Sequence, residues 1–373
     1  LVDYSNLLDH SSLRRQIKII ADKLTVSTRP VLYVGSGVRA PHSFSAFSDF
    51  LHRWKIPVVT AWNSHDLLPN SHPLYAGRPG TVGTRTGNFA VQFSDTLLVV
   101  GTRLNIRQLS YNYENFADSS WVCHVDIDKA ELLKPTLNTD LSIHCSSELF
   151  FNLLSEELNS RTNHLEFSSW LTWVKKSLSK YDSFEEQNKD NPLNPYSILF
   201  QLSLLIPENS TIVCADGTAC VVTFQVFQIK ENQRLFHNSG CASMGYEIPA
   251  SIGAYYSTHK PVYCIAGDGS IMMNIQELAI IGRLNLPIVI FVLNNKGYSS
   301  IRQTQKNYFP DNIVGCSDDS GLPFPEFSKL ATAFDIQYIS VKHSISDIDI
   351  SLFQDITKPY LVEIFLPSSS LST

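Results

Sequence analysis

The stretch Val262-Tyr-Cys-Ile-Ala-Gly-Asp-Gly-Ser270 has the pattern of a buried apolar strand that ends in a glycine-rich, acidic loop. A second apolar run over residues 288–293 ends in Asn294-Asn-Lys-Gly-Tyr298. The pattern between them predicts a helix over residues 274–284. A β-α-β unit of this kind brings both strand ends to one edge of a parallel sheet. We therefore expect the two loops to lie next to each other.

Together the two loops suit a divalent cation that holds an anion. Asp268 offers a carboxylate, Asn295 an amide oxygen and Gly297 a backbone carbonyl, which are the oxygen ligands that a hard cation prefers. The glycines beside Asp268 let backbone N–H groups approach an anion, and a helix after Ser270 would direct its N-terminus at the negative charge. Either loop alone is more typical of an ordinary turn. The pair predicts a magnesium site that binds a diphosphate.

Apolar strands alternate with amphipathic helices in two segments, and this pattern is typical of an α/β fold with parallel sheets covered on both faces. Each apolar run ends in Gly, Asp or a small polar residue, which is where open α/β sheets bind ligands. The runs cover residues 30–34, 56–60, 96–100 and 121–125 in the first segment, and 211–215, 262–266 and 288–293 in the second. The pattern predicts two doubly wound parallel-sheet domains.

Length supports two domains, because 373 residues exceed the roughly 250 at which single cores stop growing. We predict a Rossmann-like central domain over residues 1–160 and a diphosphate-binding domain over residues 192–373. Residues 161–191 are expected to form a linker with one helix, since Ser183-Phe-Glu-Glu-Gln-Asn-Lys-Asp-Asn191 is strongly polar. The Ser-rich last residues are expected to be frayed.

Charge and composition favour a cytoplasmic enzyme that acts on a small molecule. The net charge of -6 and the lack of a Lys/Arg cluster give no basis for binding nucleic acid or an anionic membrane. No apolar run approaches the roughly 18 residues of a membrane helix, and the first residues lack a signal-peptide pattern. The 7 cysteines contain no C-x-x-C and stand mostly in apolar runs, so we expect them to be reduced and buried.

Gly267-Asp-Gly-Ser270 with the later Asn294-Asn295 resembles the signature of thiamine diphosphate (ThDP) enzymes. Ser239-Gly-Cys-Ala-Ser-Met-Gly-Tyr-Glu-Ile-Pro-Ala-Ser-Ile-Gly-Ala254 is similar to the G-x-x-x-M-G-x-x-x-P-A-A-I-G-A stretch of the acetolactate synthase group, and Met273-Asn-Ile-Gln-Glu-Leu278 also matches. The resemblance covers nearly the whole chain. It implies ThDP and Mg²⁺ as cofactors, and decarboxylation of a 2-oxo acid such as pyruvate with transfer of the two-carbon unit to an acceptor.

The resemblance also implies roles for individual residues. Asp268, Asn295 and the Gly297 carbonyl would bind Mg²⁺. Met244 would lie beneath the thiazolium ring and enforce the bent cofactor conformation, and the Ala242 carbonyl would face the 4'-amino group. The spacing of Met244 alone favours a core methionine. The remaining expected cofactor-binding residues line the two sides of the diphosphate: Gly217, Thr218, Ala219, Gly267, Gly269, Ser270 and Tyr298.

The first segment carries a weak dinucleotide fingerprint, Gly35-Ser-Gly37-Val-Arg-Ala40. The acidic residue that NAD sites carry after the next strand is missing, since Val58-Val-Thr60-Ala61 stands there, so NAD is disfavoured. In the family this domain is a six-stranded Rossmann-like unit that holds FAD in acetolactate synthases. The segments that match the flavin loops are Gly101-Thr-Arg103-Leu-Asn-Ile-Arg107, Asp126-Ile-Asp128 and Thr81-Val-Gly83-Thr84.

FAD is therefore one expectation for the central domain. The alternative is that Arg103 and Arg107 are surface or interface arginines in a domain that only scaffolds a homodimer or tetramer. The sequence leaves both interpretations open.

Two departures from the family limit what the resemblance implies. The catalytic glutamate of ThDP enzymes stands on a pyrimidine-binding domain that precedes the central domain, and this glutamate is absent from the chain, which begins at Leu1. A missing N-terminal segment or a partner chain would supply it.

The second departure is Thr304, which stands where acetolactate synthases carry a tryptophan. Arg302 and Gln303 are candidates to face the acceptor, with a helix salt bridge and a solvated amide as alternatives. Acyl transfer to a keto sugar, simple 2-oxo acid decarboxylation and a non-catalytic cofactor-binding subunit remain alternative functions.

Overall fold

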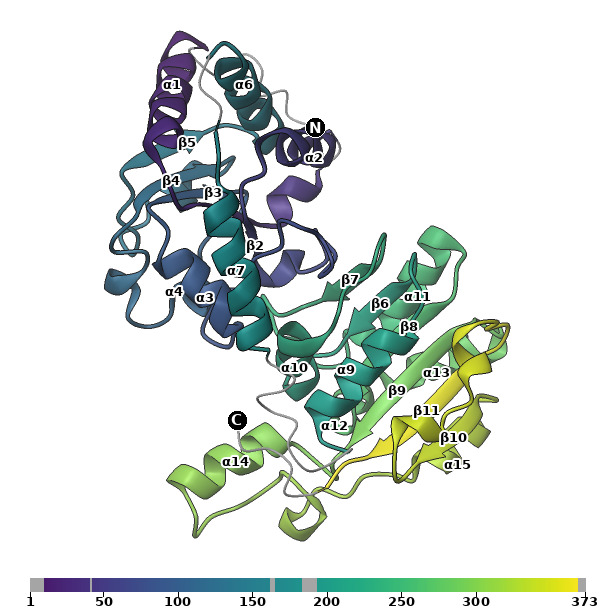
Figure 1. Ribbon diagram of the computed structural model, residues 1–373. Helices are drawn as coiled ribbons and strands as arrows, with labels where there is room; N and C mark the ends of the chain where they lie inside the picture. Colours follow the sequence, from purple (N-terminus) through teal and green to yellow (C-terminus); the bar gives the residue numbers. More distant parts are fainter. Residues whose placement is uncertain (1–9, 41, 162–164, 183–192, 368–373) are drawn as a thin grey trace. The chain divides into compact units, whose positions relative to one another are not determined.

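The computed structural model describes residues 10–40, 42–161, 165–182 and 193–367 (Figure 1). They belong to two compact units, Leu1–Asp182 and Ser183–Thr373, which we describe separately. The polar run expected as a linker, residues 183–191, lies outside the described residues, as do residues 368–373.

The first unit is built on a parallel sheet of five strands, in the order β2-β1-β3-β4-β5. Strand order reverses between β1 and β3, which is the position where doubly wound sheets open a ligand crevice. The sixth strand that the family resemblance implied is not found among the described residues of this unit. The strands are β1 (Pro30–Val34), β2 (Val58–Thr60), β3 (Thr96–Val100), β4 (Trp121–Asp126) and β5 (Leu141–His144).

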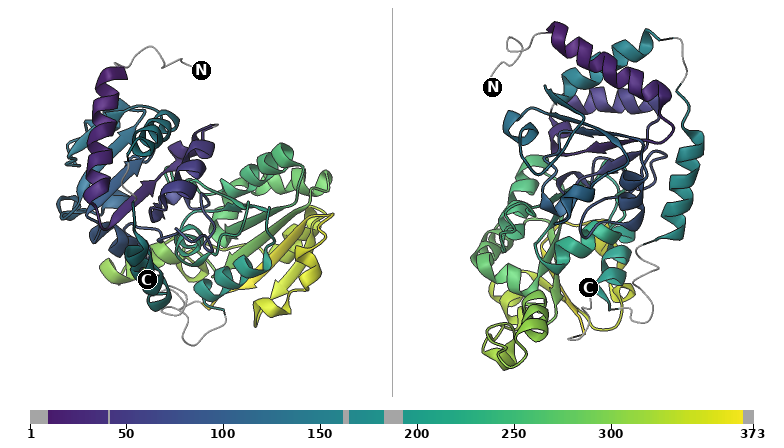
Figure 2. Two further views of the ribbon diagram at one scale, coloured as in Figure 1. Left: turned by 45° about the horizontal axis from the view of Figure 1, so that its top comes forward. Right: turned by 90° about the vertical axis from the view of Figure 1, so that its left-hand side faces the viewer.

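Helices cover both faces of this sheet, because successive strand residues point to opposite sides. Leu32 and Val34 pack with α1, α2 and α6, whereas Val31 and Tyr33 pack with α3 and α7. Figure 2 shows the helices on the two sides of the strands. The helices are α1 (His10–Val26), α2 (Ser43–Trp54), α3 (Arg85–Gln92), α4 (Ile106–Leu109), α5 (Lys129–Leu132), α6 (Ser147–Asn159) and α7 (Ser168–Lys180).

Helix α7, which the sequence placed in the linker, contributes to the core of the first unit. The Trp170 side chain is buried, and its indole N–H donates to the Pro30 carbonyl at 3.1 Å. Val174 is also buried against this face of the sheet. The first compact unit therefore extends past residue 160.

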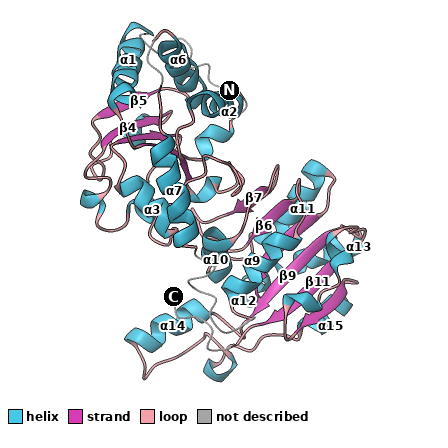
Figure 3. Cartoon of the chain, viewed as in Figure 1, coloured by secondary structure: helices cyan, strands magenta, loops and turns pink. Residues whose placement is uncertain are grey.

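The second unit contains a parallel sheet of six strands in the order β10-β11-β9-β8-β6-β7 (Figure 3). The strands are β6 (Thr211–Cys214), β7 (Arg234–His237), β8 (Val262–Gly267), β9 (Ile288–Asn294), β10 (Gln337–Val341) and β11 (Tyr360–Phe365). The chain moves outward from β6 to β7 and then crosses to β8, so the switch point lies between β6 and β8. The predicted fold class, two doubly wound parallel-sheet α/β units, is confirmed.

Two layers of helices sandwich this second sheet. One face packs on α9 and α10, and the other on α11, α12, α13 and α15. The helices of the unit are α9 (Pro195–Leu205), α10 (Thr218–Val226), α11 (Glu247–Thr258), α12 (Asp268–Ile271), α13 (Leu278–Arg283), α14 (Ser299–Tyr308) and α15 (Phe327–Ala333).

Two details differ from expectation. The single helix predicted over residues 274–284 is instead a 3-10 segment, Met272–Glu277, followed by α13, and Asn274 has non-helical φ -135° and ψ 38°. All cysteines are free, but Cys241 is exposed and not buried. Among the described residues, no helix has both the length and the apolar character to cross a membrane.

Candidate cofactor site

A small cavity lies at the carboxyl ends of β6, β8 and β9, next to the switch point of the second sheet. It is lined by eleven of the twelve residues predicted to bind cofactor or metal: Gly217, Thr218, Ala219, Met244, Gly267, Asp268, Gly269, Ser270, Asn295, Gly297 and Tyr298. Ala242 does not line the cavity; it is exposed, has φ 55°, and donates its N–H to the Asn238 carbonyl at 2.7 Å. The cavity is also lined by five residues that were not predicted from the sequence: Asp216, Leu293, Ser299, Ser300 and Leu366.

The buried carboxylate of Asp268 joins the two predicted loops. One oxygen, Oδ1, accepts the Gly269 N–H at 2.8 Å. The other, Oδ2, accepts the N–H groups of Gly297 at 2.9 Å and Asn295 at 3.1 Å. Burial raises the pKa of Asp268 to about 6, and the backbone hydrogen bonds oppose that rise. A bound cation would favour the charged carboxylate at this position.

The Asn295 side-chain amide has a hydrogen-bond partner for its nitrogen but none for its oxygen among the described residues. The nitrogen Nδ2 donates to the Ser299 hydroxyl at 3.2 Å. The oxygen Oδ1 is buried and has no hydrogen-bond partner among the described residues. A buried acceptor without a donor is costly, and a cation would satisfy it.

The donor set fits Mg²⁺ better than a transition metal. In the described part of the chain, no group of three or more His, Cys, Asp or Glu side chains is placed to hold a metal ion. The two loops instead offer the Asp268 carboxylate, the Asn295 amide oxygen and backbone carbonyls, with Asp216 on the opposite side of the cavity. Hard oxygen donors, few of them charged, suit Mg²⁺ that also binds phosphate oxygens.

Two positions in the site require glycine, because a Cβ atom there would collide with neighbouring atoms. A Cβ on Gly269 would lie 2.1 Å from the ring of Tyr298, so that ring lies directly on the acidic loop. A Cβ on Gly297, whose φ is 136°, would lie 2.1 Å from the Cys316 carbonyl oxygen. The loop positions are thus set by close backbone approach.

The opposite side of the cavity is formed by the end of β6. Gly217 has φ 68° and ψ -140°, and α10 begins at the next residue. The preceding Asp216 is buried, and its charge adds to the rise in pKa that burial gives Tyr246 and Glu247. An acidic residue directly before the positive-φ glycine was the sequence signal for Asp216.

Met244 is 40% exposed and lines the cavity, so it is not a core methionine of this unit. The following residue, Gly245, donates its N–H to the Ser270 hydroxyl at 2.9 Å. That hydroxyl in turn donates to Oε2 of the buried Glu247 at 3.0 Å. The turn that carries Met244 and the loop that carries Asp268 are therefore hydrogen-bonded to each other.

The three residues considered for the acceptor lie on α14 and outside the cavity lining. Arg302 donates from Nη2 to the Asn295 carbonyl at 3.1 Å, so it supports the asparagine loop, and it makes no ion pair among the described residues. Thr304 is exposed, and its hydroxyl donates to the Ser300 carbonyl at 3.1 Å. Gln303 is half-buried.

Comparison with known proteins agrees with this geometry. Residues 216–364 match the thiamine pyrophosphate enzyme C-terminal TPP-binding domain, and residues 17–154 match the central domain of the same enzymes. The chain belongs to the thiamine diphosphate enzymes. The match to the C-terminal domain begins at Asp216, which lines the cavity, and covers both loops.

Relatives of this ThDP enzyme chain include acetolactate synthase large subunits. It is 30% identical over 360 residues to the one from Cyanidium caldarium, which is 92% of this chain and 60% of that protein. Isozyme 2 of Escherichia coli (strain K12) is 30% identical over 346 residues, 91% of this chain and 60% of that protein. The chain thus spans about 60% of the length of the curated relatives it matches.

The glycines of the central ThDP-enzyme domain meet at the switch point of the first sheet. The Gly35 N–H donates to the Val100 carbonyl at 3.0 Å, and the Gly37 N–H donates to the Gly101 carbonyl at 2.9 Å. A Cβ on Gly35 would lie 2.3 Å from the Gly101 carbonyl oxygen. These glycines allow a close junction of the strand ends β1 and β3, and both N–H groups are already bonded within the protein.

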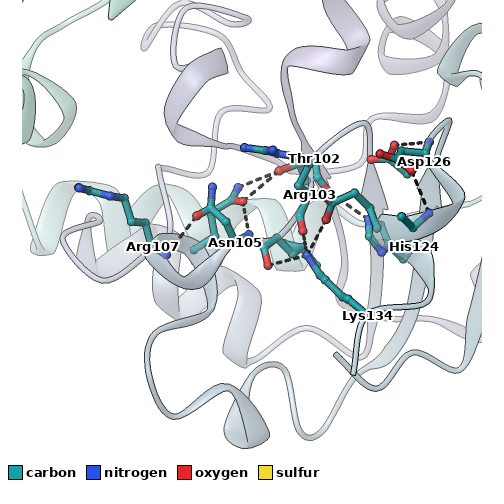
Figure 4. A network of polar contacts seen from close by, with 12 residues as sticks. Thr102, Arg103, Asn105, Arg107, His124, Asp126 and Lys134 are labelled. Carbon is teal, nitrogen blue, oxygen red and sulfur yellow. Dashed lines mark hydrogen bonds and ion pairs between the residues drawn. The ribbon is translucent and has the colours of Figure 1, made fainter. Parts of the chain in front are cut away.

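Two exposed arginines follow β3: Arg103 lies on the loop after the strand and Arg107 on α4 (Figure 4). The Arg107 guanidinium lies over the Trp62 ring, 5.2 Å from its centroid. Neither Arg103 nor Arg107 makes an ion pair within the described part of the chain. The Lys134 ammonium donates to the carbonyls of Arg103 and of Leu104, the latter at 3.1 Å, and so fixes the loop.

The other expected flavin segments lie beside this loop or on the neighbouring strand. Thr81 donates its N–H and its hydroxyl to the Arg107 carbonyl, at 2.8 and 2.9 Å. The Gly83 N–H donates to the Gly80 carbonyl at 2.9 Å. Asp126 ends β4, is buried, and accepts the Asp128 N–H at 2.9 Å.

Proposed function

We propose that this chain binds ThDP and Mg²⁺ and takes part in decarboxylation of a 2-oxo acid, with pyruvate as the expected substrate, and in carboligation of the two-carbon unit to an acceptor. The buried, partnerless Oδ1 of Asn295, in the loop bound by the Asp268 carboxylate, carries the proposal. An apolar core offers no reason for such an arrangement, whereas a cation does.

Different residues around the cavity would bind the metal ion and the diphosphate. Asp268, Asn295 and the Gly297 carbonyl would hold Mg²⁺, and the loops beginning at Gly217 and Gly267 would hold the diphosphate. When bound, ThDP supplies the carbanion chemistry that protein side chains lack. The protein fixes the diphosphate and excludes water from the reacting carbon.

The two ends of the cofactor would be placed by different residues. Met244, which projects into the cavity, would support the thiazolium ring, and the Ala242 carbonyl would face the 4'-amino group. The Tyr298 ring, which lies on Gly269, would cover the diphosphate loop.

Ser299→Ala is expected to weaken Mg²⁺-dependent ThDP binding about tenfold, because Asn295 loses the hydroxyl that fixes its amide. Calorimetric titration of ThDP at fixed Mg²⁺ measures the effect, and the melting temperature should stay near that of the unaltered chain. Thr304→Ala, an exposed hydroxyl on the same helix and outside the cavity lining, is the matched control and should bind normally. Equal affinities for all three proteins would remove Ser299 from this role.

A pyruvate assay tests the reaction. The full protein is incubated with ThDP, Mg²⁺ and pyruvate, and acetolactate, acetaldehyde and adducts of an added keto sugar are measured. Acetolactate would support the acetolactate synthase-like reaction, acetaldehyde a simple decarboxylase, and a sugar adduct the acyl-transfer alternative. Absence of CO₂ release, while ThDP binds, would favour a non-catalytic cofactor-binding subunit.

The catalytic glutamate and the assembly also belong to the proposal. The chain spans about 60% of its relatives, and we place the pyrimidine-binding domain in a segment outside this sequence or in a partner chain. A homodimer or tetramer in the cytoplasm is the expected state. Light scattering of the full protein gives the number of subunits.

FAD in the central domain is a second candidate, favoured by two exposed arginines that have no carboxylate partner among the described residues. Arg103 lies on the loop that Lys134 fixes, and Arg107 lies on α4. Arg103→Met with Arg107→Met should lower FAD affinity by at least tenfold, because each guanidinium can bind a phosphate. Flavin fluorescence quenching measures the affinity, and exposed Arg15→Met on α1 is the control. No quenching by the unaltered chain would leave these arginines as surface or interface residues.

A further inference from the structure

Glu247 is a fully buried acidic residue to which the proposed function assigns no role. It opens α11, is 0% exposed and does not line the cavity. Its Oε2 accepts the Ser270 hydroxyl at 3.0 Å, and its Oε1 is buried with no hydrogen-bond partner among the described residues. Burying a carboxyl group with an unpaired oxygen is unfavourable, so we looked for a function that offsets this cost.

The Ser270 hydroxyl is a junction between two loops that border the cavity. It accepts the Gly245 N–H at 2.9 Å while it donates to Glu247. Met244 comes directly before Gly245, and Gly269 comes directly before Ser270, and both line the cavity. One side chain thus links the residue expected under the cofactor ring to the loop expected around its diphosphate.

The Gly245 peptide has little freedom to move. Its φ is 82°, and a Cβ there would lie 2.8 Å from the Met273 side chain. Its carbonyl accepts Nδ2 of Asn274 at 3.0 Å, so the residue is held by a hydrogen bond on each side. Releasing the Ser270 bond would leave the Met244 turn held on one side only.

The backbone of Glu247 is itself well anchored. Its carbonyl accepts the Ser251 hydroxyl at 2.7 Å and the Cys264 thiol at 3.7 Å. Ser251 lies one turn along α11, and Cys264 lies on β8, the strand that leads into the Asp268 loop. The carboxyl group therefore projects toward Ser270 from a rigid base, which a positioning residue needs.

We propose that Glu247 is a positioning residue that, through Ser270, holds the Met244 turn and the Asp268 loop in one fixed arrangement, so that the ring and diphosphate parts of the cofactor meet preset sites. We call the Glu247–Ser270–Gly245 chain of hydrogen bonds the tether. The effect of the tether on cofactor binding rests on the proposed function, whereas the tether itself rests only on these hydrogen bonds.

The tether works in either protonation state. Burial raises the pKa of Glu247 to about 7, and the nearby Asp216 charge adds to the rise. A charged carboxylate accepts from Ser270, whereas a neutral carboxyl can donate to the same hydroxyl oxygen. Glutamine has the same shape and the same two options, so Glu247→Gln should keep the tether and Glu247→Ala should break it.

Hydrogen exchange in the full chain tests the tether without cofactor. Glu247→Ala is expected to raise amide exchange at least tenfold in peptides spanning residues 242–246 and 268–272, while Glu247→Gln stays within about twofold of the unaltered chain. Exposed Glu231→Ala is the control. Unchanged exchange in Glu247→Ala, or equal exchange in the Ala and Gln variants, would overturn the tether.

Calorimetry with ThDP and Mg²⁺ tests the link to the cofactor. Glu247→Ala should weaken binding about tenfold and Glu247→Gln should restore it, with Ser270→Ala resembling the Ala variant. Normal binding by Glu247→Ala, despite raised exchange, would overturn the link. If the unaltered chain bound no ThDP, the proposed function and the link would both fail, and the exchange result would still decide the tether.

Discussion

Asp268→Ala should reduce Mg²⁺-dependent ThDP binding by at least a hundredfold. The change removes the proposed charged metal ligand and also the acceptor for the N–H groups of Gly297 and Asn295. Hydrogen bonds to charged groups contribute about 1.5–3 kcal/mol each, and about 3 kcal/mol corresponds to a hundredfold in affinity. Calorimetric titration of ThDP at several Mg²⁺ concentrations measures both the affinity and its dependence on the metal.

Asp268→Asn separates the charge from the hydrogen bonds. Its amide oxygen can still accept a loop N–H, so the melting temperature should stay closer to that of the unaltered chain than in Asp268→Ala. It lacks the negative charge, so the Mg²⁺ dependence should be lost in both variants. Exposed Asp311→Ala is the control for a general loss of charge. Mg²⁺-dependent binding that survives in Asp268→Ala would place the metal elsewhere.

The residues that the sequence could predict stand directly at strand ends. Asp268 and Asn295 follow apolar runs, and a parallel sheet must bring such ends to one edge. The structure adds the reason that they meet, since the Asp268 carboxylate accepts N–H groups from the asparagine loop. Residue roles in binding stay predictions, whereas the fold class and the family are confirmed.

The features that sequence analysis missed depend on contacts between distant segments. Glu247 has the appearance of an ordinary helix-starting acid, and only the meeting of α11 with the Ser270 loop shows its contact. Asn274 was expected inside a helix, but its amide donates to the Gly245 carbonyl, and this bond accompanies the non-helical backbone there. Periodicity reports which residues face a core and is silent on such pairings.

In the central domain, too, the sequence pattern did not reveal which groups are in contact. The spacing of Gly35 and Gly37 is typical of a phosphate-binding turn, yet both N–H groups are bonded to the end of the adjacent strand. Short glycine motifs report that backbones approach closely, and they do not report whether a ligand or another strand is the neighbour. The exposed Arg103 and Arg107 therefore carry more of the FAD proposal than the glycines do.

Gly297→Ala should destabilise the second unit by about 3 kcal/mol or more and remove Mg²⁺-dependent binding. The new Cβ would lie 2.1 Å from the Cys316 carbonyl oxygen, 3.0 Å from the Cys316 carbonyl carbon and 3.1 Å from the Cα of Ser317. All three are backbone atoms, so relief requires movement of the chain and not of a flexible side chain. The φ of 136° adds strain for any L-residue with a side chain.

Movement of this loop would also break the site. The Gly297 N–H would leave the Asp268 carboxylate, and the Tyr298 N–H would leave the Cys316 carbonyl, which it meets at 2.9 Å. Gly253→Ala is the matched control, because Gly253 is exposed on α11 with no atom near its added Cβ, and alanine favours a helix by roughly 0.5–1 kcal/mol. Urea denaturation measures the stability. A Gly297→Ala protein as stable as Gly253→Ala would show that this loop takes another path past Cys316.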